Sequence, residues 1–364
     1  MPEKNKEYKE IAKFYIDEIE KLGAEPYTIM EVCGTHTVAI AKSAIRDLLP
    51  SQIRLVSGPG CPVCVTDSSD IDRFLHLSAL PNVITATFGD MIRVPGTKKN
   101  LQMLRGEGAD VKVVYSSLEA LELARKNPDK EVVFLGVGFE TTTPTVAVSI
   151  DLAKQEGLKN YSVLPMHKVV PPILRVLAED PDLHVDAFLD PGHVCAVIGT
   201  KPLEFMAKDY GKPGVVTGFE ALDILEGIYM ILKQRAEKRS EIEIQYKRVV
   251  KHREGNVHAL DIVNKVYEPA DARWRGIGLI PASGLAIREA YEEFDAAKRF
   301  DLPEFDSPDT PGCRCGDVLK GRIYPNECPM FGKRCVPLNP VGPCMVSSEG
   351  SCAAYYRYAR RGVI

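Results

Sequence analysis

The chain has 364 residues, which at ~100–200 residues per domain leaves room for two or three domains with hydrophobic cores. Its 45% hydrophobic and 26% charged residues are ordinary globular values. The net charge of −4 offers no broad basic field, so we expect neither nucleic acid nor an anionic membrane as a partner.

The N-terminus, Met1 to Glu10, is charged and lacks the apolar core of a secretory signal. No apolar stretch approaches the ~20 residues that span a bilayer, so we expect a cytoplasmic location. In a reducing compartment, clustered thiols indicate metal or redox chemistry instead of structural disulfides. The ten cysteines are unevenly distributed, and six of them lie near the C-terminus: Cys313, Cys315, Cys328, Cys335, Cys344 and Cys352.

From residue 27 to residue 218, short apolar runs rich in β-branched residues end in Gly, Pro or an acidic residue and precede helical patterns. This alternation predicts parallel strands covered by helices on both faces. The predicted strands are 27–32, 53–57, 83–88, 111–115, 132–137, 187–189 and 215–217. Because one compact sheet seldom holds so many units, the sequence predicts two parallel-sheet α/β domains, residues 1–128 and 129–300.

A long helix is predicted from Glu220 to about Arg239, then a strand at 277–281 and a helix from Ile287 to Phe300. From residue 301 onward Pro, Gly and Cys become dense and regular periodicity disappears. The sequence therefore predicts a small irregular C-terminal domain, residues 301–364, that is held by a metal centre instead of a large core.

The spacing of the C-terminal cysteines bears on the kind of metal centre. Structural zinc sites favour closely spaced pairs of ligands, but the only such pair is Cys313-x-Cys315, and the segment contains no His. A four-iron cluster accepts well-separated thiolates, so the spacing favours [4Fe–4S] over zinc. Four cysteines are assigned as ligands: Cys328, Cys335, Cys344 and Cys352. Cys313 and Cys315 are assigned as an extra pair, and a ligand role for either one stays open.

Cys33 follows a predicted strand and precedes a helical pattern. A thiol at a helix N-terminus has its thiolate form favoured by free N–H groups and the helix dipole. His36, three residues on, could serve as a base or a second ligand. The alternative is a buried structural cysteine, which the Gly and polar neighbours disfavour.

The run Gly58-Pro59-Gly60-Cys61-Pro62-Val63-Cys64 contains a Cys-x-x-Cys pair. In a cytosolic α/β setting, this spacing predicts a redox dithiol. Half of a zinc site is the alternative, but no second Cys-x-x-Cys completes one.

Polar residues also follow two later strands. Glu140 and three threonines follow one strand in Gly138-Phe139-Glu140-Thr141-Thr142-Thr143-Pro144, and His193 follows another. These residues could bind a polar ligand or a partner. Taken alone, the first group is better explained as a helix cap with Pro near the first turn, and a structural role for His193 is as plausible as a functional one.

Together, these motifs closely resemble the HypD family of [NiFe]-hydrogenase maturation proteins, in the family's order and across nearly the whole chain. The matching motifs are Cys33-Gly34-Thr35-His36, Gly58-Pro59-Gly60-Cys61-Pro62-Val63-Cys64, Gly138-Phe139-Glu140-Thr141-Thr142, Pro191-Gly192-His193-Val194 and the tail Gly342-Pro343-Cys344-Met345-Val346-Ser347-Ser348-Glu349-Gly350-Ser351-Cys352-Ala353-Ala354-Tyr355-Tyr356.

The resemblance implies a metallocentre assembly scaffold, not a standard turnover enzyme. With a small HypC-type chaperone, the scaffold would hold the iron that becomes Fe(CN)₂CO, and the cyanide would come from a HypE-type donor working with HypF. Cys33 would be an iron ligand shared with a HypC cysteine. Cys61 and Cys64 would form a thiol relay, and the C-terminal cysteines would hold a [4Fe–4S] cluster that supplies electrons.

The resemblance also implies two α/β domains plus a cluster domain, and it makes His36, Glu140 and His193 candidates for orienting ligands or moving protons. Two rival functions remain open. A cluster-driven thiol–disulfide oxidoreductase would use the same cysteines without iron at Cys33. A zinc-stabilised binding module would be colourless. The sequence contains no Walker A motif, so ATP chemistry has no standard support.

Overall fold

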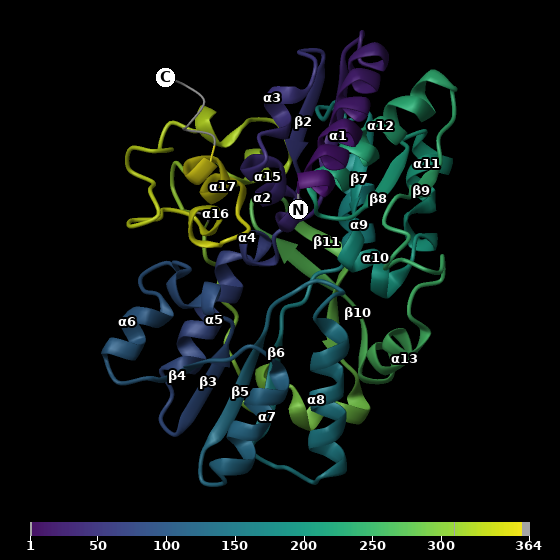
Figure 1. The fold of residues 1–364 in the computed structure, drawn as a ribbon. Coiled ribbons are helices and arrows are strands. Elements are labelled where there is room, and N and C mark those ends of the chain that lie inside the picture. Colours follow the sequence, from purple (N-terminus) through teal and green to yellow (C-terminus); the bar gives the residue numbers. More distant parts are fainter. Residues whose placement is uncertain (1, 309, 359–364) are drawn as a thin grey trace.

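The computed structural model describes residues 2–308 and 310–358, and within them two parallel β-sheets organise the fold (Figure 1). The first sheet has the strand order β2-β1-β7-β8-β9, and the second has the order β4-β3-β5-β6. Every pairing within these two sheets is parallel. The strands are β1 (Tyr27–Glu31), β2 (Ile53–Ser57), β3 (Val83–Thr87), β4 (Asp110–Val113), β5 (Glu131–Gly136), β6 (Tyr161–Pro165), β7 (Ala187–Pro191), β8 (Gly214–Thr217) and β9 (Ile242–Ile244).

Both faces of each sheet are buried, which explains why the strands read as continuous apolar runs. In the second sheet, Val133 packs into one core cluster and Phe134 into another. The predicted strands are all confirmed, with ends within two residues of those observed. β6 and β9 were not predicted. An α/β fold with parallel sheets is therefore confirmed.

Two separate stretches of the chain form the first sheet. β1 and β2 come first, the chain then forms the whole second sheet, and it returns to add β7, β8 and β9. The predicted segments 1–128 and 129–300 therefore do not coincide with sheet membership, because each sheet contains strands from both. Division of the chain into independently folding units stays a prediction.

Helices flank both sheets, and α1 packs against α12 beside the first sheet (Figure 1). The long predicted helix is confirmed as α12. The helices before the C-terminal segment are α1 (Pro2–Leu22), α2 (Gly34–Lys42), α3 (Ile45–Leu48), α4 (Pro62–Val65), α5 (Ser68–Ser78), α6 (Leu101–Gly106), α7 (Ser117–Lys126), α8 (Thr143–Gln155), α9 (Val170–Glu179), α10 (Gly192–Ile198), α11 (Glu204–Tyr210), α12 (Ala221–Ala236), α13 (Val257–Val266) and α14 (Ala296–Arg299), with 3₁₀ turns η1 (Gly89–Arg93), η2 (Lys201–Leu203) and η3 (Glu289–Phe294).

An antiparallel hairpin replaces part of the predicted pattern between residues 267 and 300. β10 (Tyr267–Trp274) pairs with β11 (Gly278–Ile287), which contains the predicted strand 277–281. The predicted helix from Ile287 to Phe300 is wrong: η3 and the short α14 occupy that stretch. Ile287 is buried and pairs with Tyr267, so the hairpin extends into residues whose local pattern suggested a helix.

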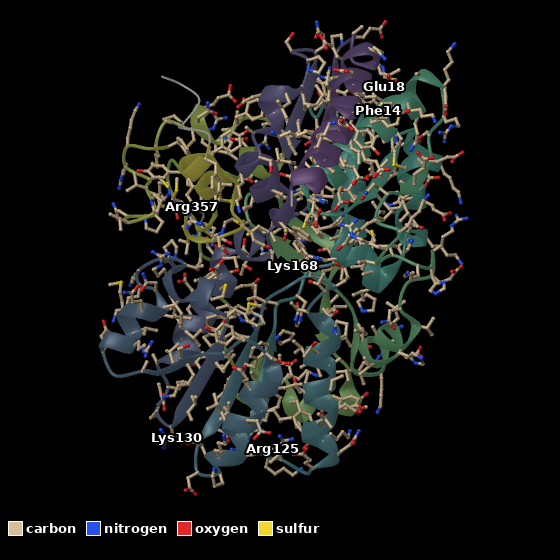
Figure 2. All side chains as sticks on the ribbon, in the orientation of Figure 1. Phe14, Glu18, Arg125, Lys130, Lys168 and Arg357 are labelled. Atoms are coloured by element: carbon tan, nitrogen blue, oxygen red, sulfur yellow. The ribbon has the colours of Figure 1, made fainter. Side chains whose placement is uncertain are left out.

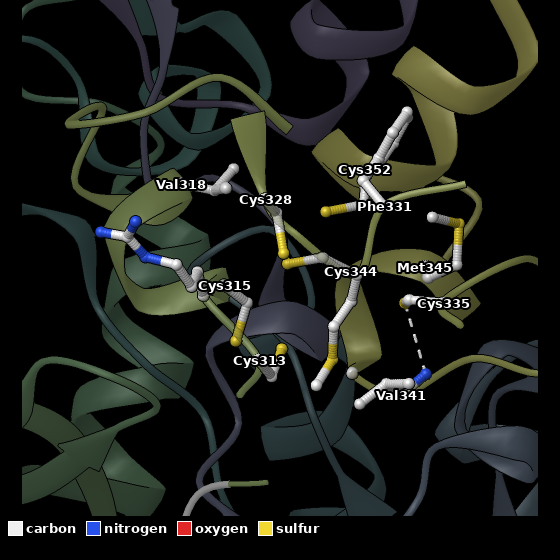
Figure 3. Close-up of a pocket in the computed structure, with 13 residues that line it drawn as sticks. Cys313, Cys315, Val318, Cys328, Phe331, Cys335, Val341, Cys344, Met345 and Cys352 are labelled. Carbon is white, nitrogen blue, oxygen red and sulfur yellow. Dashed lines mark hydrogen bonds between the residues drawn. The ribbon is translucent and has the colours of Figure 1, made fainter. Parts of the chain in front are cut away.

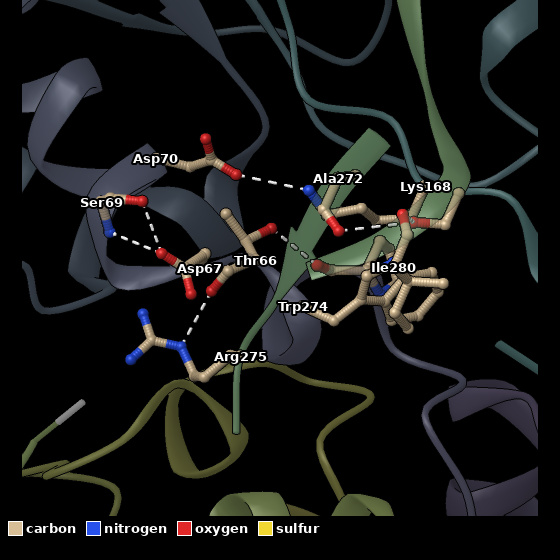
Figure 4. A network of polar contacts seen from close by, with 11 residues as sticks. Thr66, Asp67, Ser69, Asp70, Lys168, Ala272, Trp274, Arg275 and Ile280 are labelled. Atoms are coloured by element: carbon tan, nitrogen blue, oxygen red, sulfur yellow. Dashed lines mark hydrogen bonds and ion pairs between the residues drawn. The ribbon is translucent and has the colours of Figure 1, made fainter. Parts of the chain in front are cut away.

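Buried charges connect the hairpin and the two sheets. Lys168, which follows β6, lies in the middle of the molecule and is 3% exposed (Figure 2). It pairs with Asp70 of α5 at 3.3 Å (Figure 4). Its backbone N–H donates to the carbonyl of Gly138 after β5. Arg275 at the hairpin turn donates to the carbonyl of Thr66. Because leaving one member of a buried ion pair alone costs about 3–5 kcal/mol, the Lys168–Asp70 pair favours this arrangement of α5 and the segment after β6.

The C-terminal segment is irregular and packs beside the first sheet (Figure 1). Its short helices are α15 (Cys315–Leu319), α16 (Pro343–Val346) and α17 (Ser351–Tyr358), with the 3₁₀ turn η4 (Pro325–Glu327). α17 packs on α2, and α16 packs on α4. A cysteine-rich irregular segment is thus present, while its identity as an iron–sulfur domain stays a prediction. In the part of the chain that the structure describes, no helix combines the length and apolar character needed to cross a membrane.

Candidate functional site

A cavity of about 250 Å³ lies where the carboxyl ends of both parallel sheets converge, the usual place for function in such folds. We call it the Cys33 cleft. Segments after five strands contribute to its wall, and the C-terminal segment closes it. The lining residues are Val32, Cys33, Thr35, Gly60, Pro62, Val63, Phe88, Met91, Val137, Gly138, Phe139, Thr141, Thr142, Pro191, His193, Val194 and Glu349.

Cys33 is the N-cap residue of α2 and is half-buried in the cleft wall. Its backbone N–H donates to Glu31 at 3.2 Å, and the next N–H, of Gly34, donates to the carbonyl of Gly60 at 2.9 Å. A Cβ on Gly60 would lie 2.2 Å from the Cys33 nitrogen, so only glycine allows this approach. The loop that carries Cys61 therefore fixes the backbone of Cys33.

The electrostatic environment of Cys33 differs from the sequence-based expectation. Burial and the Glu349 carboxylate raise the pKa of Cys33 to about 12. The backbone N–H groups of His36 and Thr35, at the start of α2, act in the expected opposite direction but are the smaller influence. The thiol is therefore neutral until a metal ion or a base displaces its proton.

Glu349 is a site residue that the sequence did not reveal. It comes from the turn between α16 and α17, and its Oε1 accepts a hydrogen bond from the Thr35 hydroxyl at 2.7 Å. A Cβ on Gly34 would lie 2.6 Å from the Glu349 Cβ, so α2 and the tail are in close contact. The only sequence signal was the unusual tail motif, which does not say where its carboxylate points.

Two of the three other predicted polar residues are histidines, and both rings contact Phe219 although only one of them lines the cleft. His193 lines the Cys33 cleft and packs against Phe219, with 4.0 Å between ring centroids and 33° between the ring planes. His36 instead turns behind the cleft, where its Nε2 lies 2.9 Å from the Gly218 carbonyl and 3.0 Å from the Thr217 hydroxyl. Burial lowers the pKa of His36 to about 4, so its ring is neutral at physiological pH.

Glu140 faces a second cavity of about 540 Å³, on the other side of its own turn. Its Oε1 accepts the Val170 N–H at 2.8 Å at the start of α9. The other oxygen has no hydrogen-bond partner among the described residues, and burial raises the pKa of Glu140 to about 7. The structure therefore does not bring Glu140 to the thiol of Cys33, and a role in the site stays a prediction.

Cys61 and Cys64 lie behind the cleft wall, between it and the C-terminal cysteines. Both are buried, at 4% and 0% exposure, and the Cys64 N–H donates to the Cys61 sulfur at 3.3 Å. The Cys64 thiol contacts the thiol of Cys344. Burial raises the pKa of Cys64 well above its ordinary value. The predicted dithiol is thus in direct contact with a predicted cluster ligand.

All six C-terminal cysteines line one narrow pocket of about 20 Å³, which we call the sulfur pocket (Figure 3). Cys344 is at its centre and contacts Cys315, Cys352 and Cys64. The backbone N–H of Val341 donates to the Cys335 sulfur at 3.4 Å. Apart from the cysteines, the lining residues are Arg314, Val318, Met330, Phe331, Val341, Gly342 and Met345.

Soft thiolates in apolar surroundings are the donor set that iron–sulfur clusters use, so these residues fit such a cluster chemically. Among the described residues, no group of three or more Cys, His, Asp or Glu side chains has an arrangement that could hold a single metal ion. Which four thiols would bind a cluster is therefore not decided by the arrangement.

Comparisons with known proteins match nearly the whole chain. The family model HypD, described as the hydrogenase formation hypA family, matches residues 10–359. Hydrogenase maturation factor HypD of Rhodobacter capsulatus is 47% identical, over 96% of this chain and 93% of the relative. Hydrogenase maturation factor HypD2 of Bradyrhizobium diazoefficiens is 44% identical, over 92% and 90%. A putative hydrogenase expression/formation protein of Methanocaldococcus jannaschii is 44% identical, over 96% and 98%.

Proposed function

This chain belongs to the HypD family of hydrogenase maturation factors, and from that premise we propose that it is a scaffold on which the iron of a [NiFe]-hydrogenase acquires cyanide and carbonyl ligands. The observation that carries the proposal is the position of Cys33. Its half-buried thiol forms part of a cavity of about 250 Å³ where two parallel sheets end. A soft thiolate is a suitable anchor for low-spin iron carrying cyanide and CO.

Iron is the cargo of this site, and Cys33 loses its proton when it binds. Its sulfur provides one ligand, and we propose that a cysteine of a HypC-type chaperone provides another. A HypE-type protein would deliver the cyanide. His193 and Glu349 line the same cavity and are placed to orient ligands or accept the released proton.

The buried dithiol supports the redox part of the proposal. Cys61 and Cys64 lie between the Cys33 cleft and Cys344, so they are placed to carry reducing equivalents between the two regions. A [4Fe–4S] cluster held by Cys328, Cys335, Cys344 and Cys352 would supply single electrons. Cys313 and Cys315 line the same pocket as a further thiol pair.

Burial also separates this proposal from a general thiol–disulfide oxidoreductase. Such an enzyme must bring a protein disulfide to its attacking thiol. Cys61 is 4% exposed and Cys64 is fully buried, so a large disulfide substrate has no direct access to either. The geometry favours an internal relay over a broad reductase.

The test is an infrared spectrum of the chain purified anaerobically from cells that express its proposed partners. We expect cyanide and carbonyl stretches that disappear in Cys33→Ala. The matched control is Cys195→Ala, which removes a buried thiol outside both the cleft lining and the sulfur pocket and should keep the bands. Absence of the bands from the parent chain, with partners bound, would overturn the scaffold proposal.

A further inference from the structure

A continuous line of hydrogen bonds leads away from the buried thiol of Cys61. Its sulfur donates to the hydroxyl of Ser347 at 3.3 Å, and that hydroxyl donates to Asp90 Oδ2 at 3.1 Å. Ser347 is 1% exposed, whereas Asp90 is half-buried on η1, at the end of β3. The line therefore runs from a buried sulfur to a carboxylate that solvent can reach.

The carboxylate of Asp90 is held in place by a second residue of the tail. The same Oδ2 accepts the backbone N–H and the hydroxyl of Ser348, each at 2.8 Å. Three donors from two consecutive serines thus converge on one oxygen. They fix its position relative to Ser347, and a proton transfer requires such fixed donor–acceptor geometry.

We propose that Ser347 and Asp90 form the proton path of the Cys61–Cys64 dithiol, with Ser347 as the carrier and Asp90 as the base. The proposal rests on the redox role of the dithiol proposed above, and adds that the tail supplies the acid–base machinery for it. Ser347 and Asp90 act through Cys61 and are positioning residues.

The step balances without any group beyond a sulfur electrophile. The Cys61 proton moves to the Ser347 oxygen while the Ser347 hydroxyl proton moves to Asp90. The Cys61 thiolate then attacks a sulfur atom of a disulfide-class reagent, one S–S bond forms, and the reagent's leaving group departs as an anion. The Cys64 sulfur then attacks the Cys61 sulfur and its proton passes to the departing sulfur of the reagent, so that the Cys61–Cys64 disulfide forms and the reagent's sulfur leaves as a thiol.

Alternative acceptors for the Cys61 proton are poor. The Cys64 backbone N–H that contacts this sulfur is itself a donor and cannot take a proton. The Cys64 thiol also contacts Cys61, but burial raises its pKa well above the ordinary value, so it keeps its own proton. A thiol is a weak nucleophile until it loses its proton, so a buried dithiol without a base would react slowly. The contact with Ser347 gives the Cys61 proton a route to the Asp90 carboxylate. Ser347 and Asp90 form this route although they lie 257 positions apart in the chain.

The test uses the full-length chain and the small reagent methyl methanethiosulfonate, with peptide mass spectrometry to follow Cys61. We expect Asp90→Asn to slow modification of Cys61 by about a hundredfold or more, the range of general-base effects. Asparagine keeps an oxygen that accepts the serine hydrogen bonds but is no base. Ser347→Ala should slow the reaction similarly, and the double variant should be no slower than either single one.

Modification of Cys33 in the same samples is the internal reference, because Cys33 is outside the path and its rate should not change. A normal solvent deuterium isotope effect on Cys61 modification should be present in the parent chain and absent in Asp90→Asn. An unchanged rate and isotope effect in Asp90→Asn would overturn the path. If the scaffold proposal fails, the infrared bands are absent from the parent chain, but the expected effect of Asp90→Asn on the rate of Cys61 modification is unchanged.

Discussion

The Cys33 cleft and the sulfur pocket are separated by the Cys61–Cys64 loop, yet they are built in opposite ways. The cleft has a cavity of about 250 Å³ and brings one thiol together with an imidazole, a carboxylate and hydroxyl groups. The sulfur pocket has about 20 Å³, six thiols and otherwise apolar walls apart from Arg314.

This difference indicates different occupants. A cavity with one anchor and several proton-exchanging groups suits cargo that enters, reacts and leaves with a partner. A closed set of thiols suits a permanent group, because soft donors without competing oxygen ligands select it and the surrounding protein excludes solvent. Glu349 and Ser347 belong to the same turn of the tail, yet Glu349 contacts Thr35 at the Cys33 cleft whereas Ser347 contacts Cys61 behind it.

The largest effect is expected from a substitution that disrupts the sulfur pocket and leaves the Cys33 cleft unchanged. Cys344 contacts three other thiols at its centre, so Cys344→Ser should lower bound iron and sulfide by roughly tenfold or more, since serine is a much harder donor. Metal and sulfide analysis of the anaerobically purified chain measures this. Cys195→Ala, outside the pocket, should keep both. Full iron and sulfide in Cys344→Ser would remove Cys344 from the ligand set and favour Cys313 or Cys315.

The next largest effect is expected from a substitution that disrupts the Cys33 cleft and leaves the sulfur pocket unchanged. In Gly60→Ala the new Cβ would lie 2.2 Å from the Cys33 nitrogen, so Cys33 must shift. We expect a loss of about 1–3 kcal/mol of stability, as for other overpacked sites, and a strong reduction of the infrared bands with unchanged iron and sulfide of the sulfur pocket. The matched control is Gly106→Ala, where nothing lies within 4 Å of a new Cβ. Unchanged bands in Gly60→Ala would show that the position of Cys33 tolerates the shift.

The smallest expected effect is a pH-dependent change in the free energy of unfolding. Burial raises the pKa of Asp190, at the end of β7 below the cleft, to about 7. Because the unfolded pKa is about 3.9, the folded state alone keeps this proton between about pH 4 and 7. The free energy of unfolding therefore falls as the pH rises from about 4 to 7, and the stability lost in this way does not return above pH 7.

Asp190→Asn should accordingly stabilise the chain, by an order of 1–3 kcal/mol at about pH 8 and by less at about pH 5. Urea unfolding at the two pH values measures the difference. The exposed Asp129→Asn is the control, and its effect should be small at both. An equal gain for Asp190→Asn at both pH values would mean that the pKa of the folded Asp190 carboxyl is not raised and that its proton is already lost by about pH 5.

Local sequence was informative where local interactions decide the structure. The predicted strands, the long helix α12 and the thiols at strand ends follow from hydrophobic periodicity and from the Gly and Pro residues that end strands. The single helix predicted at 287–300 was wrong, because Ile287 pairs with β10 and the rest of the stretch is divided into a 3₁₀ turn and a short helix. Sheet membership was also out of reach, since β1 pairs with β7 across more than a hundred intervening residues.

Thus the sequence by itself determined the parallel α/β class, the family and the positions of the candidate thiols, because these leave regular patterns and uncommon motifs in short stretches. Only the tertiary structure decided that Glu349 closes the Cys33 cleft, that Ser347 meets both Cys61 and Asp90, and that Glu140 faces another cavity. These outcomes depend on packing between segments far apart in the chain, and the direction of a side chain at such a contact leaves no local pattern to read.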